Sequence, residues 1–200
     1  MATSTPWGVA QNVTNIARGI RSVTTAGHGG VLVSPTKNNL IPEYMRHHAG
    51  EYEEDCEWCI PAIVFESEWR LWADKTNWTS GDFQMECAWN TFKNWFPESY
   101  EKFTGKQLQI GESYNYNERI LKLQVREQFV TCAAWGDWQA GVPEGMVGLL
   151  ARRAADGQEI FSLVPKAEYS DRKNVVVGKA GVFVIDPAKH QIIPIPEYAK

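Results

Sequence analysis

Two polar clusters between residues 25 and 65 carry the side chains best suited to chemistry. The first is a histidine among glycines, in the segment Gly27-His28-Gly29-Gly30. An imidazole in such a loop presents either ring nitrogen as an acid, a base, a metal ligand or a hydrogen-bond donor. The second cluster is acidic, and crowded carboxylates can bind a divalent cation or hold one proton for transfer. Its members are Glu51, Glu53, Glu54, Asp55 and Glu57.

Each cluster also has a purely structural explanation. His28 can cap a backbone carbonyl in a turn, and the carboxylates can form a solvated helix start that meets the positive end of the helix dipole. Consecutive helical residues point in different directions, so three neighbouring acids cannot all converge on one point. At helical spacing, Trp58 shares a face with Glu54 and with Asp55. The candidate binding residues in this region are His28, Gly29, Gly30, Glu53, Glu54, Asp55 and Trp58.

A metal site would combine His28 with Glu54 or Asp55, with His47 or His48 as an optional further ligand. No H-E-x-x-H or H-x-H pattern supports it, so no metal ligand and no cofactor is assigned. No P-loop or G-x-G-x-x-G segment occurs, which argues against classical ATP or dinucleotide binding. Catalytic residues are likewise unassigned, and the candidates for such a role are His28, Glu54 and Asp55.

Cys56 and Cys59 have the C-x-x-C spacing found in zinc and redox sites. A structural zinc site usually needs a second close pair, whereas Cys87 and Cys132 are far apart in the sequence. Positions i and i+3 of a helix share a face, so both thiols can also point into a core.

Trp135 and Trp138 lie close together in a Trp-Gly-Asp-Trp segment. Two indoles near a turn can form a stacking platform for a base or for an aromatic side chain of a partner. They can equally close the end of a sheet. His190, in a turn that follows Pro187, is expected to be an ordinary surface residue.

The composition excludes several classes of function. The net charge is −4 and the pI is about 5.6, with no block of Lys and Arg, which argues against broad nucleic-acid binding. An acidic surface would suit a protein that covers a basic face of its partner. No apolar run approaches the roughly 20 residues that span a bilayer, and the N-terminus lacks the features of a signal peptide. We therefore expect no membrane association, a cytoplasmic location and reduced cysteines.

The elements that position these residues change character along the chain. Residues 1–15 are predicted as an extended arm, and the β-rich patches 16–24 and 31–34 as a hairpin around the glycine loop. From Glu51 the apolar spacing predicts a helix, with a kink or a new start near 57–61 because Pro61 interrupts it. Further helices are predicted at 66–75, at about 80–96 with Ser80 or Asp82 as cap, and at 97–104 with Gly105 as terminator.

After Gly111 the pattern turns to strands. Residues 118–130 fit either a strand or a helix. Strands are predicted at 129–138, 146–153, 159–165, 175–177, 181–186 and 191–195. The sum is one α+β domain over residues 1–200, with a mainly antiparallel sheet and three or four helices inserted after an N-terminal hairpin. Its parts are the arm at 1–15, the helical insertion at 51–105 and the main sheet at 118–195.

Four motifs occur in a fixed order: Thr5-Pro6-Trp7-Gly8, His28-Gly29-Gly30, Tyr52-Glu53-Glu54-Asp55-Cys56-x-Trp58, and Leu163-Val164-Pro165-x-x-Glu168-Tyr169. In this combination the chain resembles an uncharacterised family of small proteins carried by phages and plasmids, known only as a domain of unknown function. The resemblance spans most of the chain. It implies a mobile-element setting and supplies no mechanism.

Two functions are consistent with these features. The first is a phage or mobile-element accessory protein that binds and inhibits a host factor, such as a defence component. It would occlude a surface of a host protein or sequester a small nucleotide-like signal. The alternative is a metal-assisted hydrolase using His28 and the Glu53–Asp55 cluster; a virion or replication component is a third possibility. A single shared site requires His28 and the acidic cluster to face a common hollow beside the sheet.

Overall fold

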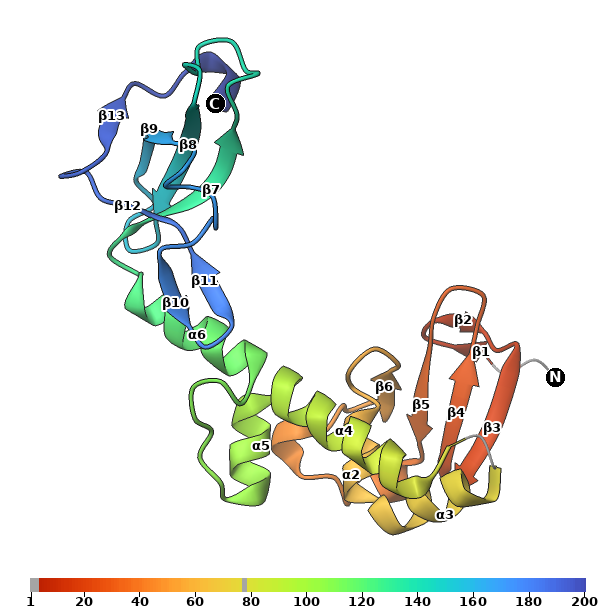
Figure 1. The fold of residues 1–200 in the computed structure, drawn as a ribbon. Coiled ribbons are helices and arrows are strands. Elements are labelled where there is room, and N and C mark those ends of the chain that lie inside the picture. Colours follow the sequence, from red (N-terminus) through yellow and green to blue (C-terminus); the bar gives the residue numbers. More distant parts are fainter. Residues whose placement is uncertain (1–3, 77–78) are drawn as a thin grey trace. The chain divides into compact units, whose positions relative to one another are not determined.

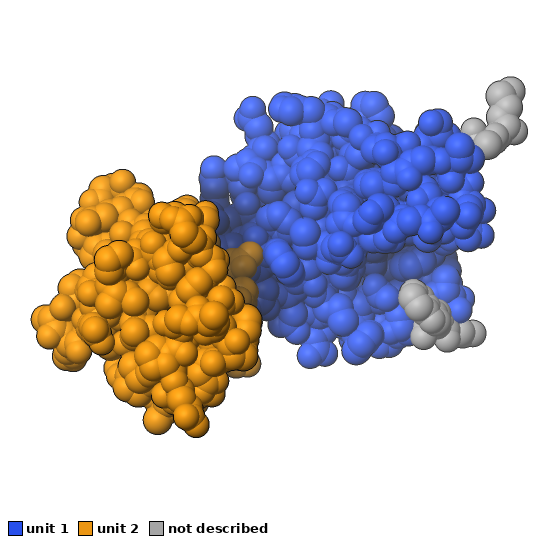
Figure 2. Space-filling model, turned by 90° about the horizontal axis from the view of Figure 1, so that it is seen from above, with its two compact units in different colours: residues 1–108 blue, residues 109–200 orange. Residues whose placement is uncertain are grey.

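The chain folds into two compact units, residues 1–108 and 109–200 (Figures 1 and 2). The computed structural model describes residues 4–76 and 79–200. The predicted α+β class with antiparallel sheets is confirmed. Where the sequence patterns predicted one domain around a single main sheet, each unit has an antiparallel sheet of its own. In the first unit, helices and sheet share one hydrophobic core.

A four-stranded antiparallel sheet organises the first unit, in the order β3-β4-β5-β6 (Figure 1). Its strands are β3 (Asn12–Ala17), β4 (Ile20–Thr24), β5 (Gly29–Val33) and β6 (Glu51–Glu53). The predicted glycine loop does join β4 to β5 as a hairpin. Within the predicted arm, residues 4–15 contain the small hairpin of β1 (Ser4–Thr5) and β2 (Gly8–Val9), followed by most of β3, and residues 1–3 of the arm lie outside the described residues. The sequence concealed β3 because most of its side chains are exposed, so it lacks an apolar alternation.

The helices of the first unit follow local signals closely. Ser80 accepts a hydrogen bond from the backbone N–H of Phe83 and so caps its helix, as predicted. Gly105 ends the last helix with φ of 71°. The elements are α1 (Pro35–Asn38), the 3-10 turn η1 (Glu43–Met45), α2 (Cys59–Val64), α3 (Glu66–Thr76), α4 (Gly81–Trp95) and α5 (Pro97–Thr104).

The helix expected from Glu51 is wrong for its first eight residues. Residues 51–53 form β6, which pairs with β5 so that Tyr52 lies opposite Val31 and Glu53 opposite Gly30. The helix α2 starts only at Cys59, which places Pro61 in its first turn, where a missing N–H is tolerated. The predicted new start near 57–61 is therefore confirmed, whereas the proposed match between the acids and a helix dipole is wrong.

The core of the first unit lies between the sheet and α2, α3 and α4. Ile20 and Tyr52 from the sheet meet Ile60, Trp69 and Phe92 from these helices, all 3% exposed or less. Burial of a side chain of this size contributes about 1.5–3 kcal/mol. This packing fixes β6 and the start of α2 to the sheet, and so fixes the acidic segment between them.

The second unit is built on a five-stranded antiparallel sheet in the order β12-β7-β8-β9-β13. The helix α6 (Tyr114–Gln124) precedes it, so the ambiguous stretch 118–130 is a helix followed by a strand, and α6 packs against the β10-β11 hairpin. The strands are β7 (Phe129–Trp135), β8 (Met146–Arg153), β9 (Glu159–Pro165), β10 (Val175–Val177), β11 (Ala180–Val182), β12 (Val184–Ile185) and β13 (Gln191–Ile193).

His190 is not the ordinary surface residue that the sequence suggested. Its side chain is only 6% exposed and both ring nitrogens are bonded. Nδ1 accepts the backbone N–H of Asp186 at 2.9 Å, so in the neutral ring Nε2 carries the proton and donates to Glu168 at 2.9 Å. The fourth sequence motif thus supports the interior of the second unit: Glu168 bonds the buried His190 ring from the surface, and the ring of Tyr169 packs edge-on against Phe183.

Within the described ranges 4–76 and 79–200, no helix has both the length and the apolar character needed to cross a membrane.

Candidate functional site

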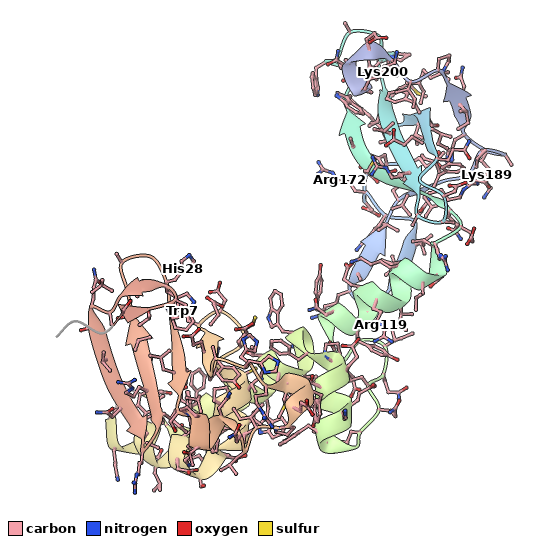
Figure 3. The ribbon with its side chains drawn as sticks, turned by 180° about the vertical axis from the view of Figure 1, so that it is seen from behind. Trp7, His28, Arg119, Arg172, Lys189 and Lys200 are labelled. Atoms are coloured by element: carbon pink, nitrogen blue, oxygen red, sulfur yellow. The ribbon has the colours of Figure 1, made fainter. Side chains whose placement is uncertain are left out.

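The glycine loop and the end of β6 meet at one end of the first sheet. His28, Glu53 and Glu54 each offer a ligand atom there, and these atoms all lie within 4.8 Å of one another. Among the residues that the structure describes, this is the only group of three or more histidine, cysteine or acidic side chains so arranged. Trp7 projects at the same end of the sheet as His28 (Figure 3). The imidazole and the acidic segment therefore share one surface.

Backbone pairing brings the two segments together. Gly30 lies opposite Glu53 in the β5–β6 ladder, and one residue further the N–H of Glu54 donates to the carbonyl of Gly29 at 3.2 Å. The loop itself is tied by Thr25, whose N–H donates to the carbonyl of His28 at 2.7 Å. The hydroxyl of Thr25 donates to the same carbonyl at 2.6 Å and accepts the N–H of His28 at 3.2 Å. The backbone on both sides is thus held in place.

Gly29 and Gly30 are required for two different reasons. A Cβ on Gly29 would lie 2.5 Å from Oε2 of Glu54 and 2.6 Å from the carbonyl oxygen of Val23. A Cβ on Gly30 would lie 2.3 Å from the ring of Trp7 and 2.3 Å from the carbonyl oxygen of Tyr52. Gly29 therefore makes room for a carboxylate, and Gly30 makes room for an indole. This explains why the first three sequence motifs meet in space.

The acidic residues divide into separate roles. Glu53 Oε2 accepts the N–H of Asp55 at 2.7 Å, and Glu57 Oε2 accepts the N–H of Glu53 at 3.0 Å. The structure groups Glu53 and Glu54 with His28 and leaves Asp55 exposed outside the group. Sequence patterns could not show which of these acids meet His28, because they predicted a helix for the segment.

A buried network of hydrogen bonds joins Tyr52 of β6 to Asn38 and, through it, to His47. The hydroxyl of Tyr52 donates to Oδ1 of Asn38 at 2.7 Å, and Nδ2 of Asn38 donates to the carbonyl of His47 at 2.7 Å. Burial raises the pKa of Tyr52 above its ordinary value. His47 Nε2 lies 3.2 Å from Glu57 Oε1, so its ring pairs with that acid and does not join His28. Neither His47 nor His48 belongs to the histidine–carboxylate group, contrary to one sequence-based option for a metal site.

A hollow of about 230 Å³ adjoins this group, and Glu54 is common to both. The indoles of Trp58 and Trp69 meet in it with ring centroids 6.0 Å apart and planes at 33°. Trp69 is 3% exposed, and its Nε1 has no hydrogen-bond partner among the described residues. The hollow is lined by Ser22, Gly30, Val31, Glu54, Trp58, Trp69 and Gln84.

Sequence reasoning missed Trp69 and Gln84 as parts of this site. They come from α3 and α4, which begin 12 and 27 residues after Glu54. Nothing local marks them, because a Trp on the buried stripe of a helix looks the same whether it packs in a core or lines a hollow. Trp58, in contrast, was predicted from its spacing to Glu54, and both line the hollow.

The C-x-x-C pair lies at the start of α2, with both thiols free. Burial raises the pKa of Cys59 far above its ordinary value of 9.0. Burial and then the charges of Glu57, Glu53 and Asp55 raise the pKa of Cys56. Nucleophilic and redox-active cysteines instead have a lowered pKa. Cys59, fully buried in the core, fits the packing explanation.

High pH is expected to destabilise the first unit, and Cys59→Ala is expected to reduce that dependence. Burial raises the pKa of Cys59 in the folded state. The stabilisation that the protonated thiol gives the folded state is therefore complete below the ordinary pKa of 9.0, and it is lost as the pH rises from there toward the folded-state pKa. In that window one thiol adds a slope of about 1.4 kcal/mol per pH unit. Urea unfolding at several pH values measures it. The raised pKa values of Cys56 and Tyr52 also make the folded state less stable at high pH, so Cys59→Ala should keep part of the pH dependence. A pH dependence of unfolding that is the same in Cys59→Ala and in the unaltered chain would contradict the role given to Cys59.

Trp135 and Trp138 lie in the second unit and have separate environments. Trp135 packs against Phe161 and Tyr198, with ring centroids 5.8 and 5.6 Å away. It therefore closes the end of the sheet, one of the two alternatives from the sequence. Trp138 is 76% exposed and folds back over Gly136. The two indoles do not form a contacting pair in the structure.

Fold and site together define an α+β protein with a histidine–carboxylate group and a small aromatic hollow at the end of its first sheet. Residues 1–126 match the family described as Domain of unknown function (DUF7007). The match covers well over half of the 200 residues, so the chain belongs to this family. It includes the whole first unit and three of the four motifs, and the motif at 163–169 lies beyond it. No curated protein and no solved structure matches the chain significantly.

Proposed function

We propose that this chain is a non-enzymatic binding protein whose recognition site is the hollow beside β5 and β6. The observation that carries this proposal is the unpaired Nε1 of Trp69, a buried donor in a ring that lines the hollow. Buried polar groups nearly always have a partner, and an unpaired one costs about 1–3 kcal/mol. This nitrogen is closed to solvent, so a ligand that displaces the side chains over it and brings an acceptor to it would recover that free energy on binding.

The other lining groups narrow the chemistry of the ligand. Two tilted indoles offer a surface on which a flat group can stack, and Glu54 offers an acceptor for N–H donors. The hollow, at about 230 Å³, exceeds the ~150 Å³ cavity that holds benzene in an engineered protein. A flat group with both donors and acceptors fits these conditions, and the side chains of a host protein and a nucleotide base both include such groups.

The biological setting follows from the resemblance of the chain to phage- and plasmid-borne proteins. In that setting the protein is an accessory factor that binds and inhibits a host component, such as a defence protein. It occludes a protein surface or sequesters a nucleotide-like signal. Its net charge of −4 supports a partner with a basic face, because opposite charge speeds association and favours the correct partner.

Affinity capture from host cells with matched variants tests this function. The intact chain and Trp138→Ala are expected to retain the same protein or small molecule. Trp58→Ala and Glu54→Gln are each expected to bind it at least about 30-fold more weakly, as for a central contact worth about 2 kcal/mol. Trp138 is a matched control because it is an exposed indole that does not line the hollow. Mass spectrometry identifies what is retained. A chemically altered ligand, or equal retention by all four proteins, would overturn the proposal.

A further inference from the structure

We propose that His28, Glu53 and Glu54 bind a divalent transition-metal cation such as Mn²⁺ or Zn²⁺. One ligand atom from each residue lies within 4.8 Å of the other two. Ligand atoms 2.0–2.2 Å from one shared ion are at most about 4.4 Å apart. The observed spacing therefore needs only a small inward movement of the three side chains, of which Glu53 is half-buried and the other two are exposed. This site shares Glu54 with the hollow proposed above as the recognition site, and the cation titration below tests it separately.

The donor set selects the class of cation. One imidazole and two carboxylates suit Mn²⁺, Fe²⁺, Co²⁺ or Zn²⁺. Ca²⁺ and Mg²⁺ prefer oxygen ligands alone, in larger number or with several retained waters. The two carboxylates together match the charge of a divalent ion. A site formed by these three residues would therefore bind such a transition-metal cation in preference to Mg²⁺ and Ca²⁺.

Hydrogen bonds hold the backbone that carries the ligands in place before any ion arrives. His28 is tied through its N–H and carbonyl to Thr25, and Glu54 through its N–H to Gly29. The carboxylate of Glu54 lies in a space that exists only because residue 29 has no Cβ. This arrangement is more specific than a chance meeting of surface acids, because a side chain at residue 29 would force that carboxylate to move.

The unpaired buried indole N–H of Trp69, in the wall of the adjoining hollow, is a separate sign that a molecule with an acceptor oxygen binds at this end of the sheet. Glu54 lies in both places, within the ligand group and in the wall that Trp69 helps to form. Three protein ligands leave coordination positions for water or for an anionic oxygen of a bound molecule. An ion here would thus fix such an oxygen next to the aromatic hollow. A hydrolytic role, the alternative function, would use the same open positions.

Manganese binding to the purified full-length chain tests the site. Free hydrated Mn²⁺ has a strong electron paramagnetic resonance signal that disappears on binding, so a titration counts ions and measures their affinity. We expect one ion per chain, and competition by Zn²⁺ but not by an equal concentration of Mg²⁺. His28→Ala and Glu54→Gln are each expected to weaken binding at least about tenfold.

Two matched controls separate this site from general attraction to an acidic surface. Asp55→Asn removes an exposed carboxylate next to Glu54 that lies outside the group, and His48→Ala removes an exposed histidine of another loop. Both are expected to keep the affinity of the unaltered chain, and circular dichroism verifies that all four variants fold. Equal weakening by Asp55→Asn and Glu54→Gln, or the absence of a stoichiometric ion, would overturn the proposal.

Discussion

Gly30→Ala is expected to destabilise the first unit by about 3 kcal/mol, at the upper end of the range for an overpacked core. The new methyl group would lie 2.3 Å from the Trp7 ring and 2.3 Å from the carbonyl oxygen of Tyr52. The indole can move aside, because it belongs to the short β1–β2 hairpin. The carbonyl of Tyr52 cannot move aside, because β6 is paired with β5 at this residue and the side chain of Tyr52 is fully buried. The substitution must therefore push β6 away from β5.

Urea unfolding followed by tryptophan fluorescence measures this effect. Two compact units need not unfold together, so the transition of the first unit should move to lower urea while that of the second stays in place. Gly27→Ala is the matched control in the same loop: nothing lies within 4 Å of its Cβ and its φ is negative or extended. It should change stability by less than about 0.5 kcal/mol. Equal effects of the two substitutions would show that the contacts at Gly30 do not restrict the strand.

Asn38→Ala is expected to destabilise the first unit by about 2 kcal/mol, because two hydrogen bonds of a buried side chain are lost at once and each is worth about 1 kcal/mol. The Tyr52 hydroxyl still accepts the N–H of His47, and the His47 carbonyl still accepts the N–H of Gly50. The side chain of Asn38 is 3% exposed and joins the hydroxyl of Tyr52 to the carbonyl of His47. These two bonds connect α1, the loop before β6 and β6 itself. Their loss frees the strand that leads into Glu53 and Glu54.

The same unfolding measurement, with Asn39→Ala beside it, checks this prediction. Asn39 is an exposed neighbour of Asn38, so its substitution should have little effect. Tyr52→Phe should lower the free energy of unfolding less in the Asn38→Ala variant than in the unaltered chain. In that variant the Tyr52 hydroxyl has already lost its acceptor. Additive effects of the two substitutions would contradict the hydrogen bond as the cause.

Local signals in the sequence were sufficient for α3, α4 and α5 and for most of the second sheet. Ser80, Pro97 and Gly105 mark helix ends through contacts within a few residues, and the structure has α4 and α5 between them. The strands at 146–153 and 159–165 were predicted with their observed bounds, because each has a continuous apolar pattern and a turn joins them. Such patterns act over one turn or one hairpin, so they need no knowledge of the rest of the chain.

The segment after Glu51 shows where local pattern fails. Tyr52, Cys56 and Cys59 have helical spacing, yet Tyr52 is buried from a strand and Cys59 from a helix. The deciding contact is the pairing of residues 51–53 with Gly30–Leu32, about twenty residues earlier in the chain. Pairing over that separation depends on what the intervening chain allows, and a local window contains no record of it.

The sequence by itself determined the α+β class, the helix boundaries set by caps, and the residue types able to recognise a ligand. It also placed His28 and the acidic segment at the ends of elements, where side chains reach solvent. Only the tertiary structure decided that Glu53 and Glu54, without Asp55, meet His28, and that Trp69 from α3 joins Trp58 beside them. The physical reason is that convergence depends on strand register and helix packing between segments far apart in the chain, whereas caps and turns depend on neighbours.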